Sequence, residues 1–411
     1  MRASTIVRLP FCGLPCSPLR IDAAGAGGWN VAGGCGVARA AAGRAPDRGG
    51  PRVGGRPAGL DAALGQAASI LEVAHRPHVA GLAWSTIGTA RRAVRLARRL
   101  GATLDIEGGE AAAAESEAIA IAGLASATFG SVQARADVVL LWRCNPLPEH
   151  PDLLPARLPV AAGGGERRFV RLGAAGPAEP GDLEALAALR ALALGRAPHL
   201  ATATAGALAG SLPLAALRDA AAAVAGARHA AILWDAQALR GTTGAAIALA
   251  LALLARDLND VHRAVARPLG GGGNIAGALA AVLSESGHTR DLGPRGDADA
   301  ILLIGARAGR GAGDAAATAG GGTIAAATPA PVVVIGACLP DGLGEPGVFL
   351  PTAVPGLSGG GLWMRADGIA IPVRDVVPRT APLEEEILDA LLARLPEARG
   401  AGRARLPEVA R

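Results

Sequence analysis

The sequence predicts an α/β protein with several subdomains built on parallel sheets, preceded by a small β module at the N-terminus. Short apolar runs rich in Val, Leu and Ile alternate along the chain with longer helix-like segments. Strands buried on both faces have this continuous apolar character, and their alternation with helices indicates a parallel sheet with covered faces. A length of 411 residues suffices for roughly two to four subdomains around large cores.

The composition narrows the class of protein. Hydrophobic residues make up 51% of the chain and charged residues 18%, which is typical of a globular protein and not of a disordered one. All 40 basic residues are Arg and 59 residues are Gly, a bias that a GC-rich genome explains without any particular chemistry. The formal charge of +5 is small for this length, and four Phe and five Trp are too few to support stacking on bases. We therefore expect no nucleic-acid partner.

No segment resembles a secretory signal or a membrane span. The residues before the first cysteine lack a long apolar core. The most apolar segment begins at Gly244, but it is too short for a span and Arg256 and Asp257 follow it, so we expect a buried helix. Five cysteines, an odd number, favour a reducing compartment. The expectation is a cytoplasmic protein with no membrane partner.

Turn residues and apolar periodicity define the elements of the N-terminal half. The first 45 residues form a Cys- and Gly-bearing module, in which turns separate short strands at 6–8, 19–22 and 29–31. Residues 46–57 are rich in Pro and Gly and are predicted to be a linker or an exposed loop. The elements predicted next are a helix (60–74), a strand (78–82), a helix (89–100), a helical or extended segment (119–124) and a strand (138–142).

The same patterns continue in the C-terminal half, and no internal repeat of solenoid length is present. A Gly-rich, extended stretch is predicted for 347–377. The strands predicted here are 169–172, 229–234, 300–304 and 332–335, and the helices are 183–194, 213–225, 244–260, 275–283 and 383–395.

Five arginines cluster on the helix predicted at 89–100. They are Arg91, Arg92, Arg95, Arg98 and Arg99. Their spacing favours the solvated face of one amphipathic helix, which Ser85 or Thr86 caps and Gly101 ends. The alternative is a binding site for an acidic or nucleic-acid partner.

The most informative block is TFGSVQARADVVLLWRCNP, residues 128–146. Its strand ends at Asn145-Pro146, and ligands of open α/β sheets bind at the carboxyl ends of strands, so 143–150 is predicted to be a cofactor loop. A strand followed by Cys-Asn-Pro and then by His150-Pro151 resembles the B subunit of formylmethanofuran dehydrogenase, which belongs to the molybdopterin oxidoreductase superfamily. The resemblance covers about residues 5–380 and is also specific at 348–374.

The resemblance implies a molybdopterin-oxidoreductase-like fold in four parts. These are a degenerate iron–sulfur-like module (1–57), a first α/β subdomain (58–160), a second α/β subdomain (161–345), and a C-terminal extended segment with a helix (346–411). The stretches RADVVLLWRCNP and DADAILLIGARAG resemble each other as well, which suggests two related α/β halves with a pseudo-twofold relation.

The first implied site is an iron–sulfur cluster at Cys12, Cys16 and Cys35. A four-iron cluster normally needs four thiolates. By the spacing of the superfamily, the first ligand falls on position 9, which is Leu9 in this chain. We therefore expect a degenerate cluster site that is empty.

The second implied site is the tungsten or molybdenum centre. Counting back from Thr128, the Cys and the following His of the dehydrogenase fall on Ala111 and Ala112, so the protein thiolate would be missing. Glu110 and Glu115 are nearby, but carboxylates on an Ala-rich helix are expected to be solvated charges.

The remaining implied sites are vestigial pterin loops. The residues assigned to them are Asn145, Pro146, Asn274, Arg365 and Asp367. A Gly is usual in the superfamily where Arg143 stands, so Arg143 could fill the space of the cofactor. We expect Cys144 to be a small buried residue, since no general base is evident near it, and His150 to be a loop residue.

Two weaker patterns complete the set. Gly270–Asn274 precedes a helix and could cradle a phosphate with its backbone amides, although a glycine loop alone is unspecific. Gly356–Gly360 spells GxSxG around Ser358. A nucleophile elbow needs a strand before the serine and a helix after it, so a chance match in a Gly-rich loop is expected.

Within the family, the chain resembles most the redox-inactive B subunit of the bacterial formyltransferase/hydrolase complex. The implied function is a non-redox structural subunit, without its own active site, of a complex that converts formyl-tetrahydromethanopterin to formate through a methanofuran-type carrier. The implied partners are the amidohydrolase (A), C and formyltransferase (D) subunits, and no cofactor is expected. The alternatives are a catalytic subunit with molybdopterin guanine dinucleotide, tungsten or molybdenum and a 4Fe-4S cluster, or an unrelated α/β binding protein.

Overall fold

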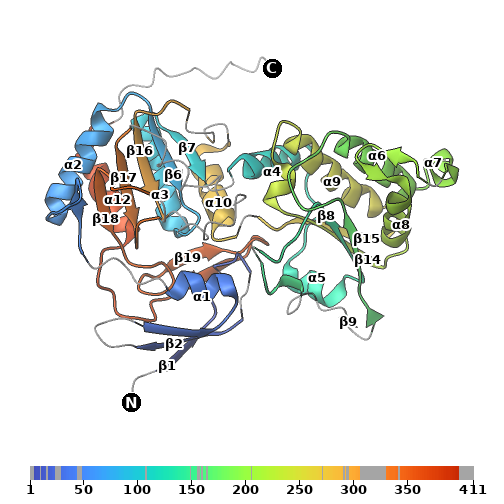
Figure 1. Ribbon diagram of the computed structural model, residues 1–411, viewed down its shortest axis with the longest axis horizontal. Coiled ribbons are helices and arrows are strands. Elements are labelled where there is room, and N and C mark those ends of the chain that lie inside the picture. Colours follow the sequence, from blue (N-terminus) through green and yellow to red (C-terminus); the bar gives the residue numbers. More distant parts are fainter. Residues whose placement is uncertain are drawn as a thin grey trace, which may run out of the picture.

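The computed structural model has two α/β lobes and a small N-terminal module, which lie side by side in Figure 1. It describes residues 4–397 except for the segments 10, 15–16, 24–28, 44–48, 107–108, 149, 155–157, 159–160, 163–164, 205, 271, 290–291, 293–295, 306–329 and 341–342. The parallel sheets and the small antiparallel module confirm the predicted fold class.

The first lobe is a seven-stranded sheet with the strand order β5-β4-β18-β17-β16-β6-β7. Five of its strands are parallel: β6 (Pro77–Gly81), β7 (Thr103–Ile106), β16 (Ala300–Ile304), β17 (Val332–Gly336) and β18 (Val348–Pro351). The helices packed on it are α2 (Leu60–Val73), α3 (Ile87–Leu100), α10 (Ile275–Ser286) and α12 (Glu384–Arg394). Their small and aliphatic side chains share one core with alternate residues of the strands.

The predicted linker at 46–57 contains structure. Its end forms a short hairpin of β4 (Arg52–Val53) and β5 (Arg56–Pro57), and β4 pairs antiparallel with β18. An edge strand is where a sheet tolerates the Pro and Gly that made this segment resemble a loop.

The second lobe is a four-stranded parallel sheet with the order β11-β8-β14-β15. Its strands are β8 (Val138–Trp142), β11 (Arg168–Leu172), β14 (His229–Trp234) and β15 (Arg263–Pro268). One face packs on the helices α4 (Gly109–Ala122), α6 (Asp182–Ala193), α8 (Leu214–Ala225) and α9 (Gly244–Leu258). The other face packs on α5 (Phe129–Arg135) and on side chains of the N-terminal module. Because both faces are covered, β8 is apolar at every position.

The N-terminal module is a three-stranded antiparallel sheet with one helix. The strands β1 (Ser4–Val7), β2 (Leu19–Ala23) and β3 (Trp29–Gly33) confirm the three predicted strands, and α1 (Gly36–Gly43) follows them. A hairpin from the C-terminal region, β19 (Gly361–Met364) and β20 (Ala370–Val373), lies where the module meets both lobes (Figure 1). The short elements that remain are β9 (Ala161–Ala162), β10 (Gly165–Glu166), β12 (Leu208–Ala209), β13 (Leu212–Pro213), α7 (Pro198–Thr202) and the 3-10 helix η3 (Ala236–Leu239).

Sheet membership crosses the boundaries that the sequence suggested at 160 and 345. β8 precedes position 160 but pairs with β11 and β14, whereas β16 and β17 precede 345 but pair with β6 and β18. The two strands expected to be counterparts, β8 and β16, each lie inside their own sheet with a parallel neighbour on both sides. Within the described residues, no helix has the length and apolar character to cross a bilayer.

Candidate functional site

The cysteine module is tightly packed around the position where the first cluster ligand was expected. Leu9 is 4% exposed and shares one core with Cys12 and Cys35. The sulfur of Cys35 accepts a hydrogen bond from Ala38 N at 3.4 Å, at the start of α1. Cys16 lies outside the described residues. Among the residues that are described, no group of three or more His, Cys, Asp or Glu side chains could hold a metal ion.

The helix α4 carries the positions where the metal ligands were expected, and it packs between the two lobes (Figure 1). Ala111 is buried in the core of the second lobe and Ala112 in that of the first. Glu110 is exposed, as expected of a solvated carboxylate, whereas Glu115 is withdrawn from solvent, contrary to the expectation. Glu115 accepts a hydrogen bond from Trp234 Nε1 at 3.3 Å, and burial raises its pKa to about 7. Glu110 accepts one from Gly241 N at 3.0 Å.

The Arg143 side chain forms a buried ion pair at the carboxyl end of β8. Its Nε and Nη2 donate to the two carboxylate oxygens of Asp182 at 2.7 and 2.9 Å, and Nη1 donates to Glu179 at 2.7 Å. The backbone of Arg143 has a φ of 42°, a conformation that favours glycine, the residue usual at this position in the superfamily. Burial alone would lower the pKa of Arg143, but the bonds to the two carboxylates outweigh it and raise the pKa. The guanidinium thus occupies the loop with partners from its own lobe.

The rest of the predicted cofactor loop is tied to its own neighbours. Asn145 is exposed, and its side-chain oxygen accepts a bond from Leu147 N at 3.3 Å, while Pro146 is buried. His150 is fully buried, and its Nδ1 lies 2.6 Å from the carbonyl oxygen of Cys12 in the N-terminal module. Cys144 is buried as expected, and burial together with nearby Asp235 raises the pKa of its thiol.

Asn274 connects three segments at the centre of the molecule. Its Nδ2 donates to Ser85 O at 2.7 Å, and its Oδ1 accepts from Met364 N at 2.7 Å. Its own backbone N–H donates to Ala83 O, and that of Gly273 donates to Phe11 O. These two amides of the glycine loop therefore point at carbonyl oxygens of this chain. The phosphate cradle considered for Gly270–Asn274 would need them to point at a ligand.

Asp367 anchors the C-terminal loop to the 128–146 block. Arg365 donates a hydrogen bond to Asp367 Oδ2, so the pairing expected from the sequence is present. The same oxygen accepts from Phe129 N at 2.9 Å, at the start of α5. Arg267 of β15 donates to the carbonyl oxygen of Ala366, so the loop is also fixed to the second lobe.

Ser358 belongs to a turn. Its hydroxyl accepts a hydrogen bond from Val354 N at 3.0 Å, and the side chain is buried. A strand, β19, follows the motif where a nucleophile elbow requires a helix. The GxSxG pattern is therefore a chance match, as expected.

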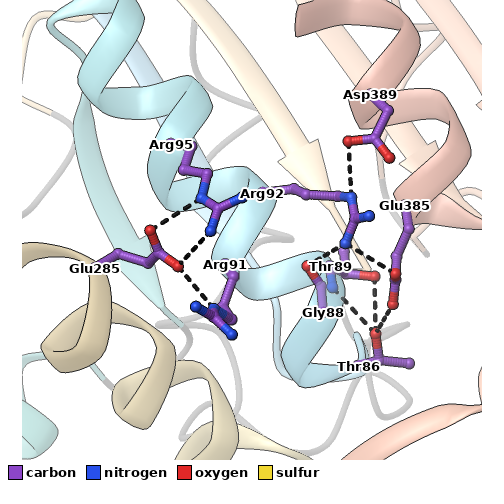
Figure 2. Close-up of polar contacts among 9 residues, drawn as sticks. All are labelled: Thr86, Gly88, Thr89, Arg91, Arg92, Arg95, Glu285, Glu385 and Asp389. Carbon is purple, nitrogen blue, oxygen red and sulfur yellow. Dashed lines mark hydrogen bonds and ion pairs between the residues drawn. The ribbon is translucent and has the colours of Figure 1, made fainter.

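The arginine face of α3 holds two other helices, as Figure 2 shows. Thr86 caps the helix by accepting from Thr89 N, and Gly101 ends it in the left-handed conformation, both as predicted. Arg91 and Arg95 pair with Glu285 of α10 at 2.7 and 2.9 Å. On the other side, Arg92 pairs with Glu385 and Asp389 of α12 (Figure 2). Arg91, Arg95 and Arg98 are exposed, as predicted for a solvated face, and the carboxylates that pair with this face come from segments distant in sequence.

The sequence did not single out a pocket at the carboxyl edge of the seven-stranded sheet. It encloses about 530 Å3 of space, part of it open to solvent, between the ends of β16 and β17 and the start of α12. Trp84 and Glu384 line it. Glu384 is one of three consecutive glutamates, 384–386, and nothing in the sequence distinguishes the buried one.

The donor set does not fit the redox centre of the superfamily. A packed leucine stands at the first cluster position, buried alanines stand at the metal positions, and the arginine of the pterin loop is fully engaged by carboxylates. Arg143 and Asn274 use their polar groups on this chain itself.

The comparisons with known proteins agree with one another. No protein-family model matches the chain. The B subunit of the formyltransferase/hydrolase complex Fhc from Methylorubrum extorquens is 30% identical over 374 residues, which cover 84% of this chain and 96% of that protein. The crystal structure of the formyltransferase/hydrolase complex FhcABCD from the same species, in complex with methylofuran, has a chain that matches with a TM-score of 0.62 and 26% identity, over 84% of this chain and 98% of that one. This chain belongs to the family of the B subunits of formyltransferase/hydrolase complexes.

Proposed function

We propose that this chain is a non-redox structural subunit of a cytoplasmic formyltransferase/hydrolase complex. The complex would move a formyl group from formyl-tetrahydromethanopterin to a methanofuran-type carrier and release it as formate. Its chemistry would reside in the amidohydrolase (A) and formyltransferase (D) subunits, with which this chain and the C subunit assemble. The observation that carries the proposal is the similarity to the B subunit of the M. extorquens complex over nearly the whole length of that protein.

The geometry of the predicted cofactor loops supports a structural role without pterin or cluster. Loops that would contact a cofactor instead join the N-terminal module, both lobes and the C-terminal hairpin through His150, Asn274 and Asp367. Each of these three side chains is buried. A scaffold needs such rigid junctions, because they hold its outer surfaces in fixed positions.

Co-expression with the A, C and D subunits of the same complex tests the assembly. An affinity tag on this chain should recover all three partners in fixed stoichiometry, and the purified complex should release formate. Metal analysis of that complex should find no tungsten or molybdenum bound to this chain. Stoichiometric tungsten or molybdenum together with iron would overturn the structural role and favour the catalytic alternative.

A second experiment tests whether a side chain of this subunit takes part in the reaction. Glu115 is the ionisable side chain one helical turn after Ala111, the position of the absent thiolate. Under the structural role, Glu115→Gln should leave the rate of formate release within about twofold of the parent complex. A large loss of rate, with the complex still assembled, would assign chemistry to this chain.

A further inference from the structure

The amino edge of the four-stranded sheet is basic. Arg135 is the last residue of α5, just before β8, while His229 and Arg263 are the first residues of β14 and β15. These strands are parallel neighbours, so their amino ends lie together at one edge of the sheet, and α5 packs on the same face (Figure 1). His229 and Arg263 lie side by side in the pairing of β14 with β15. The basic edge consists of Arg135, Arg228, His229, His262 and Arg263.

The carboxylate that is bound into the basic edge is already used. Asp137, in the turn before β8, accepts hydrogen bonds from Arg228 Nε at 3.1 Å, from Arg228 N at 3.0 Å and from His229 N at 2.9 Å. Burial alone would raise the pKa of Asp137, but these bonds outweigh it and lower the pKa. Glu166 and Asp260, which precede β11 and β15, are exposed and form no ion pair with a described residue. The charge of the other arginines is therefore not neutralised.

Arg135 and Arg263 are the arginines that remain available. Both are exposed, and their guanidinium groups make no hydrogen bond or ion pair with any residue that the structure describes. The nearby stretches of chain outside the described residues, 155–157, 159–160 and 163–164, contain no acidic residue in their sequence. Val261, two positions before Arg263, is 70% exposed. Unpaired arginines beside an exposed aliphatic side chain are typical of a protein interface.

His229 provides a second, independent observation. The residue is only 7% exposed, and its buried Nε2 has no hydrogen-bond partner among the described residues. A native protein seldom leaves a buried polar atom unpaired. Burial lowers the pKa of His229, and the charges of Arg263 and Arg135 lower it further, so the imidazole is neutral at pH 7 and can donate one N–H. An anion held by both arginines would come close to this imidazole and would accept that hydrogen bond.

We propose that the basic edge docks an acidic segment of another subunit of the complex, whose carboxylates pair with Arg135 and Arg263. Arginine binds a carboxylate through two parallel hydrogen bonds, and the two guanidinium groups have no such partner within the described chain. The basic edge contains no aromatic side chain on which a nucleic acid could stack its bases, which favours a protein partner. This proposal rests on the function proposed above, because it takes the partner from the same complex.

The absence of lysine from the sequence allows a specific crosslinking experiment. In the assembled complex, Arg263→Lys and, separately, Arg135→Lys each introduce one side-chain amine into this chain and keep the positive charge. A carbodiimide joins an amine to a carboxylate without a spacer, so it links only groups in direct contact. Mass spectrometry then identifies the linked residue. We expect both variants to link to an Asp or Glu of the A, C or D subunit.

Arg56→Lys is the matched control. Arg56 is also exposed and without an ion pair in the described chain, but it lies on β5, at the far edge of the other sheet. Its yield of links should be at most about a tenth of that from position 263. An assembled complex without links from the basic edge, or with links only to a second copy of this chain, would overturn the proposal. Failure of the parent chain to recover the other subunits would overturn the proposed function first, and the docking surface with it.

Reversal of charge measures how much the basic edge contributes to binding. Arg135→Glu/Arg263→Glu should weaken the affinity for the linked subunit at least about tenfold at low salt, whereas Arg56→Glu should change it less than about twofold. Unchanged affinity in the double variant would refute the proposal, as would RNA that copurifies with the parent complex and is lost in this variant. Should the double variant fail to fold, Arg135→Gln/Arg263→Gln decides, because unchanged affinity after removal of both charges contradicts their role.

Discussion

Removal of Asp182 should destabilise the second lobe far more than removal of Glu179, although both carboxylates bind Arg143. The Arg143 side chain is 2% exposed and that of Asp182 is 1% exposed, whereas the side chain of Glu179 is 54% exposed. Asp182→Ala would leave a guanidinium in the interior without its bidentate partner. Breaking a buried pair in this way costs about 3–5 kcal/mol.

Glu179→Ala is the matched control on the same arginine. Solvent screens this contact, and exposed ion pairs contribute about 0–1 kcal/mol. Urea denaturation followed by tryptophan fluorescence measures both variants, and the difference in unfolding free energy should be at least about 2 kcal/mol. Equal effects of the two variants would refute the argument from burial.

The double variant Arg143→Gly/Asp182→Ala separates charge from packing. Glycine suits the positive φ of position 143, and the double variant has no unpaired buried charge. It should therefore be more stable than Asp182→Ala alone, with a coupling energy of about 2 kcal/mol or more. A double variant that merely adds the two single losses would mean that the pair contributes no specific interaction.

Three further predictions concern other buried or paired groups. Glu285→Gln should lower the free energy of unfolding by only about 1 kcal/mol at pH 7, because its partners Arg91 and Arg95 are half exposed. In thermal melts, the parent should lose this advantage as the pH falls from 4.5 towards 2, where the depressed pKa of Glu285 lies. Glu384 has a raised pKa, so the parent should lose stability as the pH rises from 4.5 through 8, and melts of Glu384→Gln should lack that loss. Asn274→Ala should cost about 2–3 kcal/mol in urea denaturation, because it leaves the partly buried Met364 N–H and the buried Ser85 carbonyl unpaired. A loss below about 0.5 kcal/mol would contradict the junction described for this residue.

Local pattern was enough to predict the strongest elements. β8 spans Val138–Trp142 as predicted, since five apolar residues between polar turns leave little ambiguity. β7 and β15 were missed. The strand β7 has only four residues and includes Asp105, and β15 begins and ends with polar or imino residues, Arg263 and Pro268. Their strand character comes from pairing with β6 and β14, which no short window of sequence contains.

The candidate site, like the fold, was predictable from the sequence only in part. The identities of Leu9 and Ala111 were enough to predict that the ligand set is incomplete. The environment of Glu115 was not predictable, because Trp234, more than a hundred positions later in the chain, provides its partner. Likewise, the arginines of α3 belong to a helix whose pattern is that of a surface, and only the folded chain brings Glu285 and Glu385 to them. Amphipathic spacing indicates which face is polar, and it carries no information on what that face meets.

The interleaving of the two sheets sets an order for biosynthesis. Every strand of the four-stranded sheet lies between β7 and β16 in the chain, so that lobe can complete its strand pairing as soon as residue 268 has left the ribosome. The seven-stranded sheet cannot, because His78 of β6 pairs with Ile301 of β16. Until then, β6 has an open edge, and α3 lacks the carboxylates of α12 for longer still, because α12 follows β16 in the chain. The nascent chain therefore exposes an unpaired, aggregation-prone edge of β6 until β16 has been synthesised. A chaperone would bind the chain during this interval.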